Sequence, residues 1–175
     1  PSTFLGEIEK DLIRFSDRIL TEAEELCRIS ESNEPQLRQY DPWGRRIDEV
    51  IVSAGWKGLE RISAEEGLVA IGYERKHGEY SRIHQFAKLF LFHPSSDFYT
   101  CPLAMTDGAA RLIEVHGNPK MKEHAYRRLT SRDPKLFWTS GQWMTERTGG
   151  SDVSASETLA RKEGAHYRLY GDKWF

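Results

Sequence analysis

The fold is decided by one short stretch, Gln142-Trp143-Met144-Thr145-Glu146-Arg147-Thr148-Gly149-Gly150-Ser151-Asp152. The stretch predicts an extended segment that enters a glycine turn closed by a serine and an aspartate. It places two hydroxyls and flexible backbone N–H donors along one path. Because glycine has no Cβ, successive N–H groups can approach an anion such as a phosphate. The residues alone leave two interpretations open: a site for a flat, polar ligand that bears phosphate, or a plain loop ended by an Asx-type turn.

A second stretch further along the chain extends this pattern, Tyr167-Arg168-Leu169-Tyr170-Gly171-Asp172-Lys173-Trp174-Phe175. Met144-Thr145-Glu146 with Gly149-Gly150-Ser151-Asp152, followed by Gly171-Asp172-Lys173-Trp174-Phe175, resembles the acyl-CoA dehydrogenase family. In that family a Met-Thr-Glu…Gly-Ser-Asp strand and loop, followed by a Gly-x-Lys-aromatic hairpin, hold FAD. Two further stretches, residues 40–50 and 101–106, resemble the branch that includes the bacterial alkylation-response flavoprotein and its eukaryotic relatives. The resemblance covers nearly the whole chain, but only the amino-terminal part of such an enzyme.

The resemblance implies specific roles for residues of both stretches. Thr145, beside Met144, would donate its hydroxyl to the pyrimidine end of the flavin and tune it toward hydride acceptance. Ser151 would contact the pyrophosphate and face a bound acyl-CoA, and Phe175 would pack against the isoalloxazine ring. The expected cofactor-binding residues are Gln142, Trp143, Met144, Thr145, Gly149, Gly150, Ser151 and Phe175, with Ser151 also binding substrate.

The same resemblance places the catalytic base, a glutamate, in a carboxy-terminal helical domain, so we expect no catalytic residue in this chain. Glu146 is interpreted as a structural member of the motif. The expected function is that of an FAD-dependent acyl-CoA dehydrogenase, which oxidises a fatty acyl-CoA at its α,β bond and passes hydride to flavin N5. Electrons would leave to an electron-transfer flavoprotein or a similar acceptor, from a homo-oligomer (dimer or tetramer). Two alternatives stay open: a flavoprotein that sequesters fatty acyl-CoA without efficient turnover, and a DNA-associated flavoprotein of alkylation defence.

Hydrophobic periodicity predicts an α+β fold with a helical amino-terminal domain, residues 1–136. Phe4, Ile8, Leu12, Phe15, Ile19 and Leu26 recur at helical spacing. Further helices are predicted over about 57–70, 81–92, 100–115 and 119–129, and residues 33–46 are predicted as a loop because of their prolines. Residues 46–52 are predicted to be extended.

From Phe137 the pattern changes to strand-like density, so residues 137–175 are expected to open an antiparallel, β-barrel-like middle domain that continues beyond this chain. Strands are expected over 138–145, 157–161 and 166–170, with a turn over 162–165. The pair Gly171-Asp172 is expected to form a two-residue hairpin turn.

Composition and charge exclude several classes of function. The chain of 175 residues has 25 basic and 27 acidic side chains and a net charge of -2, so nucleic-acid binding through this segment is not expected. The basic group Lys120, Lys122, Arg127, Arg128 and Arg132 is interpreted as a solvated helix face. Two cysteines and six scattered histidines predict neither a disulfide scaffold nor a metal site. The sequence predicts no membrane span or secretory signal, and the cytosol, the mitochondrion and the peroxisome all remain open as compartments.

Overall fold

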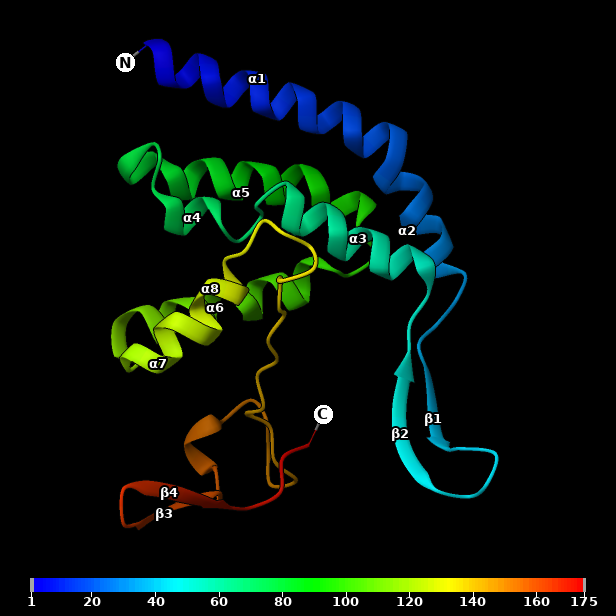
Figure 1. The fold of residues 1–175 in the computed structure, drawn as a ribbon, viewed down its shortest axis with the longest axis vertical. Helices are drawn as coiled ribbons and strands as arrows, with labels where there is room; N and C mark the ends of the chain where they lie inside the picture. The colour runs from blue at the N-terminus through cyan, green and yellow to red at the C-terminus, as the bar shows by residue number, and fades with distance from the viewer. Residues whose placement is uncertain (1, 175) are drawn as a thin grey trace. The chain divides into compact units, whose positions relative to one another are not determined.

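The structure, a computed structural model, describes residues 2–174 of the chain. It divides into two compact units, Pro1–Ser140 and Gly141–Phe175. The first unit is mostly helical and carries one hairpin, and the second contains a further hairpin (Figure 1). The α-helices of the first unit are α1 (Ser2–Arg18), α2 (Glu24–Glu31), α3 (Ala54–Glu65), α4 (Ile71–Glu74), α5 (Ser81–Phe92), α6 (Thr100–His116), α7 (Pro119–Met121) and α8 (Arg127–Leu129).

Most predicted helices are confirmed, and their ends have local causes. Helix α5 has the predicted bounds, and α6 begins at the predicted Thr100. Helix α3 begins earlier than predicted because the Ser53 hydroxyl accepts a hydrogen bond from the Trp56 N–H at 3.0 Å. It also ends earlier, at Glu65, since Gly67 adopts a φ of +64° that a continuing helix does not allow.

A π-helical turn, Ile19–Ala23, joins α1 to α2, and another, Lys122–Tyr126, joins α7 to α8. Along α1, the first of these turns and α2, the buried positions are Phe15, Ile19, Ala23, Cys27 and Ser30. A four-residue spacing drifts around a helix of 3.6 residues per turn. The wider π turn absorbs that drift, so both helices keep one face toward the core.

The prediction of a loop over residues 33–46 is wrong in part, because the structure forms a strand within this range. Strands β1 (Gln36–Tyr40) and β2 (Arg46–Ile51) form an antiparallel hairpin with Leu37 opposite Val50. Pro35 and Pro42 lie on either side of β1 and do not interrupt it, so they mark its ends. The extended segment expected over 46–52 is confirmed by β2.

The second unit also departs from the predicted strands. Residues 138–145, predicted as a strand, contain no regular strand in the structure, and an isolated bridge joins Glu146 to Gly149. Strand β3 (Leu159–Glu163) begins two residues later than expected and pairs with β4 (His166–Tyr170). Their two-residue turn begins at Gly164, with a φ of +61°. The turn predicted over 162–165 is thus confirmed. The second hairpin turn, predicted at Gly171-Asp172, is wrong for the described residues, because no strand follows over 173–174. A Cβ on Gly171 would lie 2.3 Å from the Thr158 hydroxyl, so this glycine allows close packing instead.

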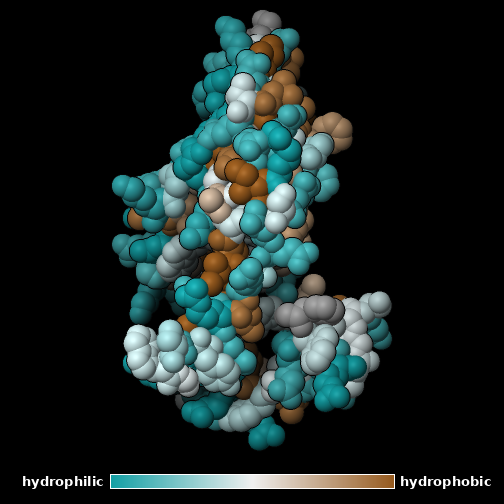
Figure 2. Space-filling view, turned by 90° about the vertical axis from the view of Figure 1, so that its right-hand side faces the viewer, coloured by the Kyte–Doolittle hydropathy of each residue, from teal (hydrophilic) through white to brown (hydrophobic). Residues whose placement is uncertain are grey.

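The apolar core lies in the helical unit. Its cluster joins side chains from α1, α3, α5 and α6 with Leu129 and Phe137, and Phe15 and Phe92 are fully buried within it. Hydrophobic side chains also reach the surface, where they break a mainly hydrophilic face (Figure 2).

A buried ion cluster accompanies this core. The Lys88 ammonium on α5 is 1% exposed, and it donates to the Asp11 carboxylate on α1 at 3.0 Å and to the Glu66 carboxylate at 2.8 Å. Glu66, just after α3, also accepts hydrogen bonds from Arg14 and Arg18 of α1. One buried carboxylate thus joins three helical segments.

Replacing Lys88 by methionine tests this cluster. Lys88→Met keeps the length of the side chain but leaves the buried carboxylate of Glu66 and the half-buried carboxylate of Asp11 without their shared cation. We expect the free energy of unfolding to fall by about 3–5 kcal/mol, the range for removing one partner of a buried pair. Urea unfolding measures the loss, and Lys10→Met, on the exposed side of α1, serves as the control. Equal stability of the two variants would contradict a structural role for the cluster.

Acid pH provides a second test. Burial alone would raise the pKa of Asp11, but hydrogen bonds from Arg14, Lys88 and His84 outweigh burial and lower that pKa from 3.8 to about 2. A depressed pKa contributes stability that is present above the unfolded-state value and is lost as pH falls through the folded-state value. We therefore expect the urea midpoint to fall between about pH 4 and about pH 2. Asp11→Asn should flatten that part of the profile, and an unchanged profile would refute the assignment.

Candidate functional site

The stretch that dominates the sequence forms a tight turn in the second unit. The Glu146 N–H donates to the Gly149 carbonyl at 3.2 Å, and the Gly149 N–H donates to the Glu146 carbonyl at 3.1 Å. This exchange closes a two-residue loop of Arg147 and Thr148. The next pair outward is Thr145 and Gly150, which lie so close that a Cβ on Gly150 would be 2.9 Å from Thr145 Cγ2 and 3.0 Å from its hydroxyl. Any larger residue at position 150 would therefore displace the Thr145 hydroxyl from its observed position.

The Glu146 carboxylate holds the base of this turn. It accepts hydrogen bonds from the Ser156 hydroxyl at 2.7 Å, the Glu157 N–H at 2.6 Å, and the Thr158 N–H and hydroxyl at 3.1 Å and 2.5 Å. The Lys173 ammonium donates a further bond at 2.7 Å. These donors, Lys173 foremost, hold the pKa of Glu146 well below its usual value, so the carboxylate is ionised at neutral pH.

The predicted cofactor residues occupy different environments. Gln142, Trp143, Met144 and Ser151 are exposed, and Thr145 is half-buried. Phe175 lies outside the described residues. The roles inferred for these positions stay predictions.

One detail of the glycine pair differs from the sequence-based expectation. The Gly149 N–H is already used inside the turn, so this pair does not present two successive N–H donors to an anion. The sequence does not distinguish the two glycines, and in the structure Gly149 alone of the pair has a positive φ, +156°.

The end of the loop is a capped turn. The Asp152 carboxylate accepts hydrogen bonds from the Ser154 N–H at 3.0 Å and from the Ser154 hydroxyl, which caps the short helical turn Val153–Ala155. This is the Asx-type turn of the simpler interpretation. It follows Ser151 and does not involve the Thr145–Gly150 contact. The simpler interpretation therefore describes the end of the stretch, and the ligand site stays a prediction.

Three residues of the site were missed by sequence reasoning: Ser156, Thr158 and Lys173. The sequence places Lys173 in the motif but assigns it no contact. In the structure Lys173 forms an ion pair with Glu146, which belongs to the other half of that motif. A glutamate and a lysine far apart in sequence carry no spacing signal, so the pair becomes visible only when the chain folds back on itself.

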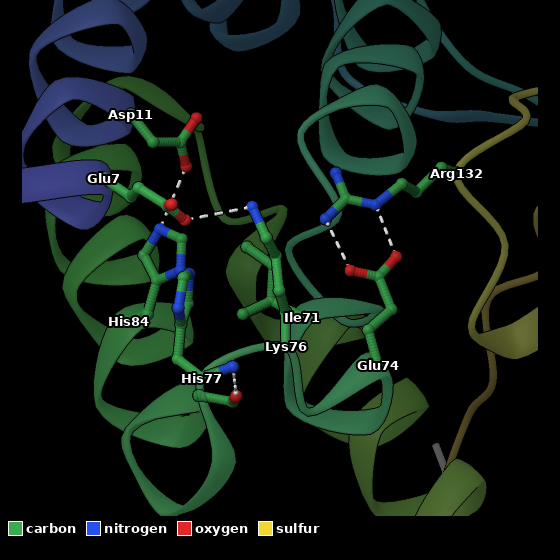
Figure 3. Close-up of a pocket in the computed structure, with 9 residues that line it drawn as sticks. Glu7, Asp11, Ile71, Glu74, Lys76, His77, His84 and Arg132 are labelled. Carbon is green, nitrogen blue, oxygen red and sulfur yellow. Dashed lines mark hydrogen bonds and ion pairs between the residues drawn. The ribbon is translucent and has the colours of Figure 1, made fainter. Parts of the chain in front are cut away.

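A polar cavity of about 220 Å³ lies in the helical unit (Figure 3). Its charged walls are paired: Glu74 forms two hydrogen bonds with Arg132, Lys76 lies 3.1 Å from Glu7, and Asp11 accepts from His84. Cations already paired in this way attract an added anion weakly. The Nδ1 atom of His84 is buried and lacks a protein partner among the described residues. The cavity contributes to no candidate active site.

Helices α5 and α6 share an open apolar groove, lined by Ile83, Phe86, Ala87, Leu89, Phe90, His93, Thr100 and Ala104. Phe90 is 80% exposed and Ile83 is 65% exposed. Apolar grooves on a protein surface are commonly covered by another helix or by an apolar ligand. Within residues 2–174 we found no helix able to cross a membrane and no cluster of acidic, histidine or cysteine side chains suited to a metal ion.

Gly150→Ala tests the contact between Gly150 and Thr145. The added methyl group must push the Thr145 side chain from its rotamer, which costs about 0.5–1.5 kcal/mol. FAD is the cofactor that the family resemblance implies, and we expect apoprotein of the full-length variant to bind it more weakly by that amount, measured by titration. Gly141→Ala is the matched control, because its Cβ would meet only Trp143 Nε1, at 3.8 Å. Wild-type affinity in Gly150→Ala would show that the hydroxyl's position does not matter.

Comparison with known proteins finds a matching family and two similar proteins. The profile of a family described as Adaptive response protein AidB N-terminal domain matches residues 8–134. The chain is 46% identical over 181 residues to acyl-CoA dehydrogenase family member 11 of Caenorhabditis elegans, covering 100% of the chain and 29% of that protein. It is 29% identical over 163 residues to the putative acyl-CoA dehydrogenase AidB of Escherichia coli (strain K12), covering 88% of the chain and 30% of that protein.

Solved structures agree with these relatives. The crystal structure of Caenorhabditis elegans ACDH-11 in complex with C11-CoA matches with a TM-score of 0.92 and 46% identity, over 99% of this chain and 30% of that chain. The apo-form of Bd2924 matches with a TM-score of 0.92 and 47% identity, over 99% of this chain and 36% of that chain. The chain therefore belongs to the AidB N-terminal domain family, and it is homologous to acyl-CoA dehydrogenase family member 11 and AidB over the amino-terminal part of those proteins.

Proposed function

We propose that this chain is the amino-terminal part of an FAD-dependent acyl-CoA dehydrogenase, and that residues 141–175 begin the β domain that holds the flavin. The observation that carries the proposal is the Thr145–Gly150 contact, in which a hydroxyl lies against a glycine where any Cβ would displace it. The family membership and the acyl-CoA in the ACDH-11 crystal structure support it. The chain covers 29% and 30% of its two curated relatives, so the activity concerns the longer protein.

The residues present fit a flavin. Thr145 would donate its hydroxyl to the pyrimidine end of the ring, flanked by Gln142, Trp143 and Met144, and Ser151 would meet the pyrophosphate. The bound flavin would supply the hydride acceptor. Gly150 would leave room for Thr145, and Gly149 would contribute its backbone conformation, since its N–H is used in the turn. Phe175, which lies outside the described residues, would pack against the ring as the resemblance implies.

The substrate would be a fatty acyl-CoA. A base outside residues 1–175 would remove its α proton, and the electrons would pass to an electron-transfer flavoprotein or a similar acceptor. The complex of ACDH-11 with C11-CoA also supports an alternative, a flavoprotein that binds fatty acyl-CoA without efficient turnover. The two functions differ in one measurable step, the reduction of the flavin by the acyl-CoA. We propose a homo-oligomer for the full-length protein in both cases.

The central test uses the full-length protein. We expect it to purify with FAD, and we expect an acyl-CoA of suitable chain length to bleach the oxidised flavin band. FAD without bleaching by any acyl-CoA of a panel, together with measurable acyl-CoA binding, would favour the sequestering protein. A colourless protein that cannot be reconstituted with FAD would refute both.

Two substitutions assign the binding residues, Thr145→Val and Ser151→Ala. Thr145→Val removes a hydroxyl and nearly keeps the shape, so FAD affinity should fall by about 0.5–1.5 kcal/mol. Ser151→Ala should weaken FAD or acyl-CoA by about 1–3 kcal/mol, the range for a hydrogen bond to a charged group. Titration of each apoprotein measures both, and Thr148→Val, exposed in the same turn, is the control. If both variants bind both ligands normally, the turn has no ligand-binding role.

A further inference from the structure

The second unit is organised around a carboxylate. Among its described residues, 141–174, Glu146 is the one that is buried, with 6% of its surface exposed. Thr145, Thr158 and Lys173 are half-buried, and the large apolar side chains Trp143 and Leu169 are 74% and 72% exposed. A pair of strands is marginally stable without an apolar face to cover. Among the described residues 141–174, the contacts that join distant stretches are mainly polar.

The Glu146 carboxylate and the Lys173 ammonium join three stretches of chain. Glu146 accepts from residues 156–158 as well as from Lys173. Lys173 in turn donates to the Met144 carbonyl at 3.2 Å, to Glu146 at 2.7 Å and to the Ser156 hydroxyl at 3.0 Å. An ammonium group has three N–H donors, so these bonds use all of them.

The pair also reaches the neighbouring residues through the backbone. The Trp174 N–H donates to the Thr145 carbonyl at 2.9 Å, next to the bond from Lys173 to the Met144 carbonyl. Successive carbonyls of residues 144 and 145 are thus bonded to successive residues 173 and 174. The direction of the Met144–Thr145 edge follows from where Lys173 is held.

We propose that Glu146 and Lys173 are positioning residues of the flavin site, whose ion pair holds the Met144–Thr145 edge in the conformation that receives the pyrimidine end of the ring. The inference rests on the proposed function. Neither side chain is assigned a contact with the flavin. Their action runs through the Met144 carbonyl and through the turn that places Thr145 against Gly150.

An ion pair suits this task because its loss disturbs many bonds at once. Without Lys173, the Glu146 carboxylate stays out of water with neutral donors alone, which favours rearrangement of the turn. Without the Glu146 carboxylate, the N–H groups of Glu157 and Thr158 lose their acceptor. Either change would move residues 144–146, although neither residue touches the ligand.

The test compares Lys173→Met with Lys173→Arg, Thr158→Val and the control Lys162→Met in the full-length protein. Lys162 lies exposed on β3 of the same unit. We expect Lys173→Met to lower FAD affinity about tenfold or more, the scale of a lost charge-assisted hydrogen bond. Thr158→Val, which removes one neutral donor to Glu146, should lower it less. Lys173→Arg keeps the charge and should restore part of the affinity.

Two further readouts separate positioning from mere stability. The absorption spectrum and reduction potential of the bound flavin should shift in Lys173→Met and recover in Lys173→Arg, since the hydroxyl donor at the ring has moved. Amide hydrogen exchange of residues 144–150 in the apoprotein should rise in Lys173→Met and not in Lys162→Met.

If wild-type protein binds FAD and Lys173→Met matches its affinity, spectrum and potential, the positioning role is refuted. Equal effects of Lys173→Met and Lys162→Met would also refute it. If Lys173→Met does not fold, Thr158→Val decides: wild-type affinity, spectrum and potential in that variant would refute the role. Failure of the wild-type protein to take up FAD would instead overturn the proposed function, so the two failures are distinguishable.

Discussion

Each unit of this chain depends on a carboxylate that has been taken out of water. Desolvating a charge is unfavourable by several kcal/mol, so such a group is tolerated only where its partners are complete. Glu66 meets this condition with Lys88, Arg14 and Arg18 in the helical unit, and Glu146 meets it with Lys173 and neutral donors in the second unit. In both units the carboxylate joins segments that are distant in sequence. The geometry of the helices and of the candidate site follows from satisfying these two groups.

The two carboxylates act in different surroundings. Glu66 lies beside an apolar core that includes Phe15 and Phe92, so the ion cluster there adds specificity to packing that hydrophobic burial already favours. Among the described residues 141–174, the bonds to the Glu146 carboxylate are the ones that join distant stretches of the chain. The candidate flavin edge is therefore built on polar contacts, whose strength depends on direction. Directional contacts can fix a hydroxyl such as that of Thr145 more narrowly than apolar packing can.

Sequence reasoning predicted the helices well because their signals are local. The spacing of apolar residues and the prolines gave α5 its bounds and α6 its start, and the family resemblance is confirmed by the comparisons. The strands were predicted less well. Strand β1 was missed because prolines lie on both sides of it and are typical of loops. The turn predicted over 162–165 is confirmed at Gly164, and the further hairpin turn predicted at Gly171-Asp172 was wrong because a glycine followed by aspartate also occurs where a close contact excludes any side chain. The Glu146–Lys173 pair could not be predicted, since it depends on how distant segments meet.

The π-helical turn between α1 and α2 has a consequence for how relatives of this chain align. A π turn is equivalent to one residue inserted into an α-helix. The buried positions from Phe15 to Ser30 are now separated by steps of four, four, four and three residues. If one residue is removed from Ile19–Ala23, these steps become four, three, four and three, as in a regular amphipathic helix. Both helices would then still face the core. A relative that lacks one residue at this place would therefore keep the fold and differ in helix winding, with a regular α-helix in place of the π turn.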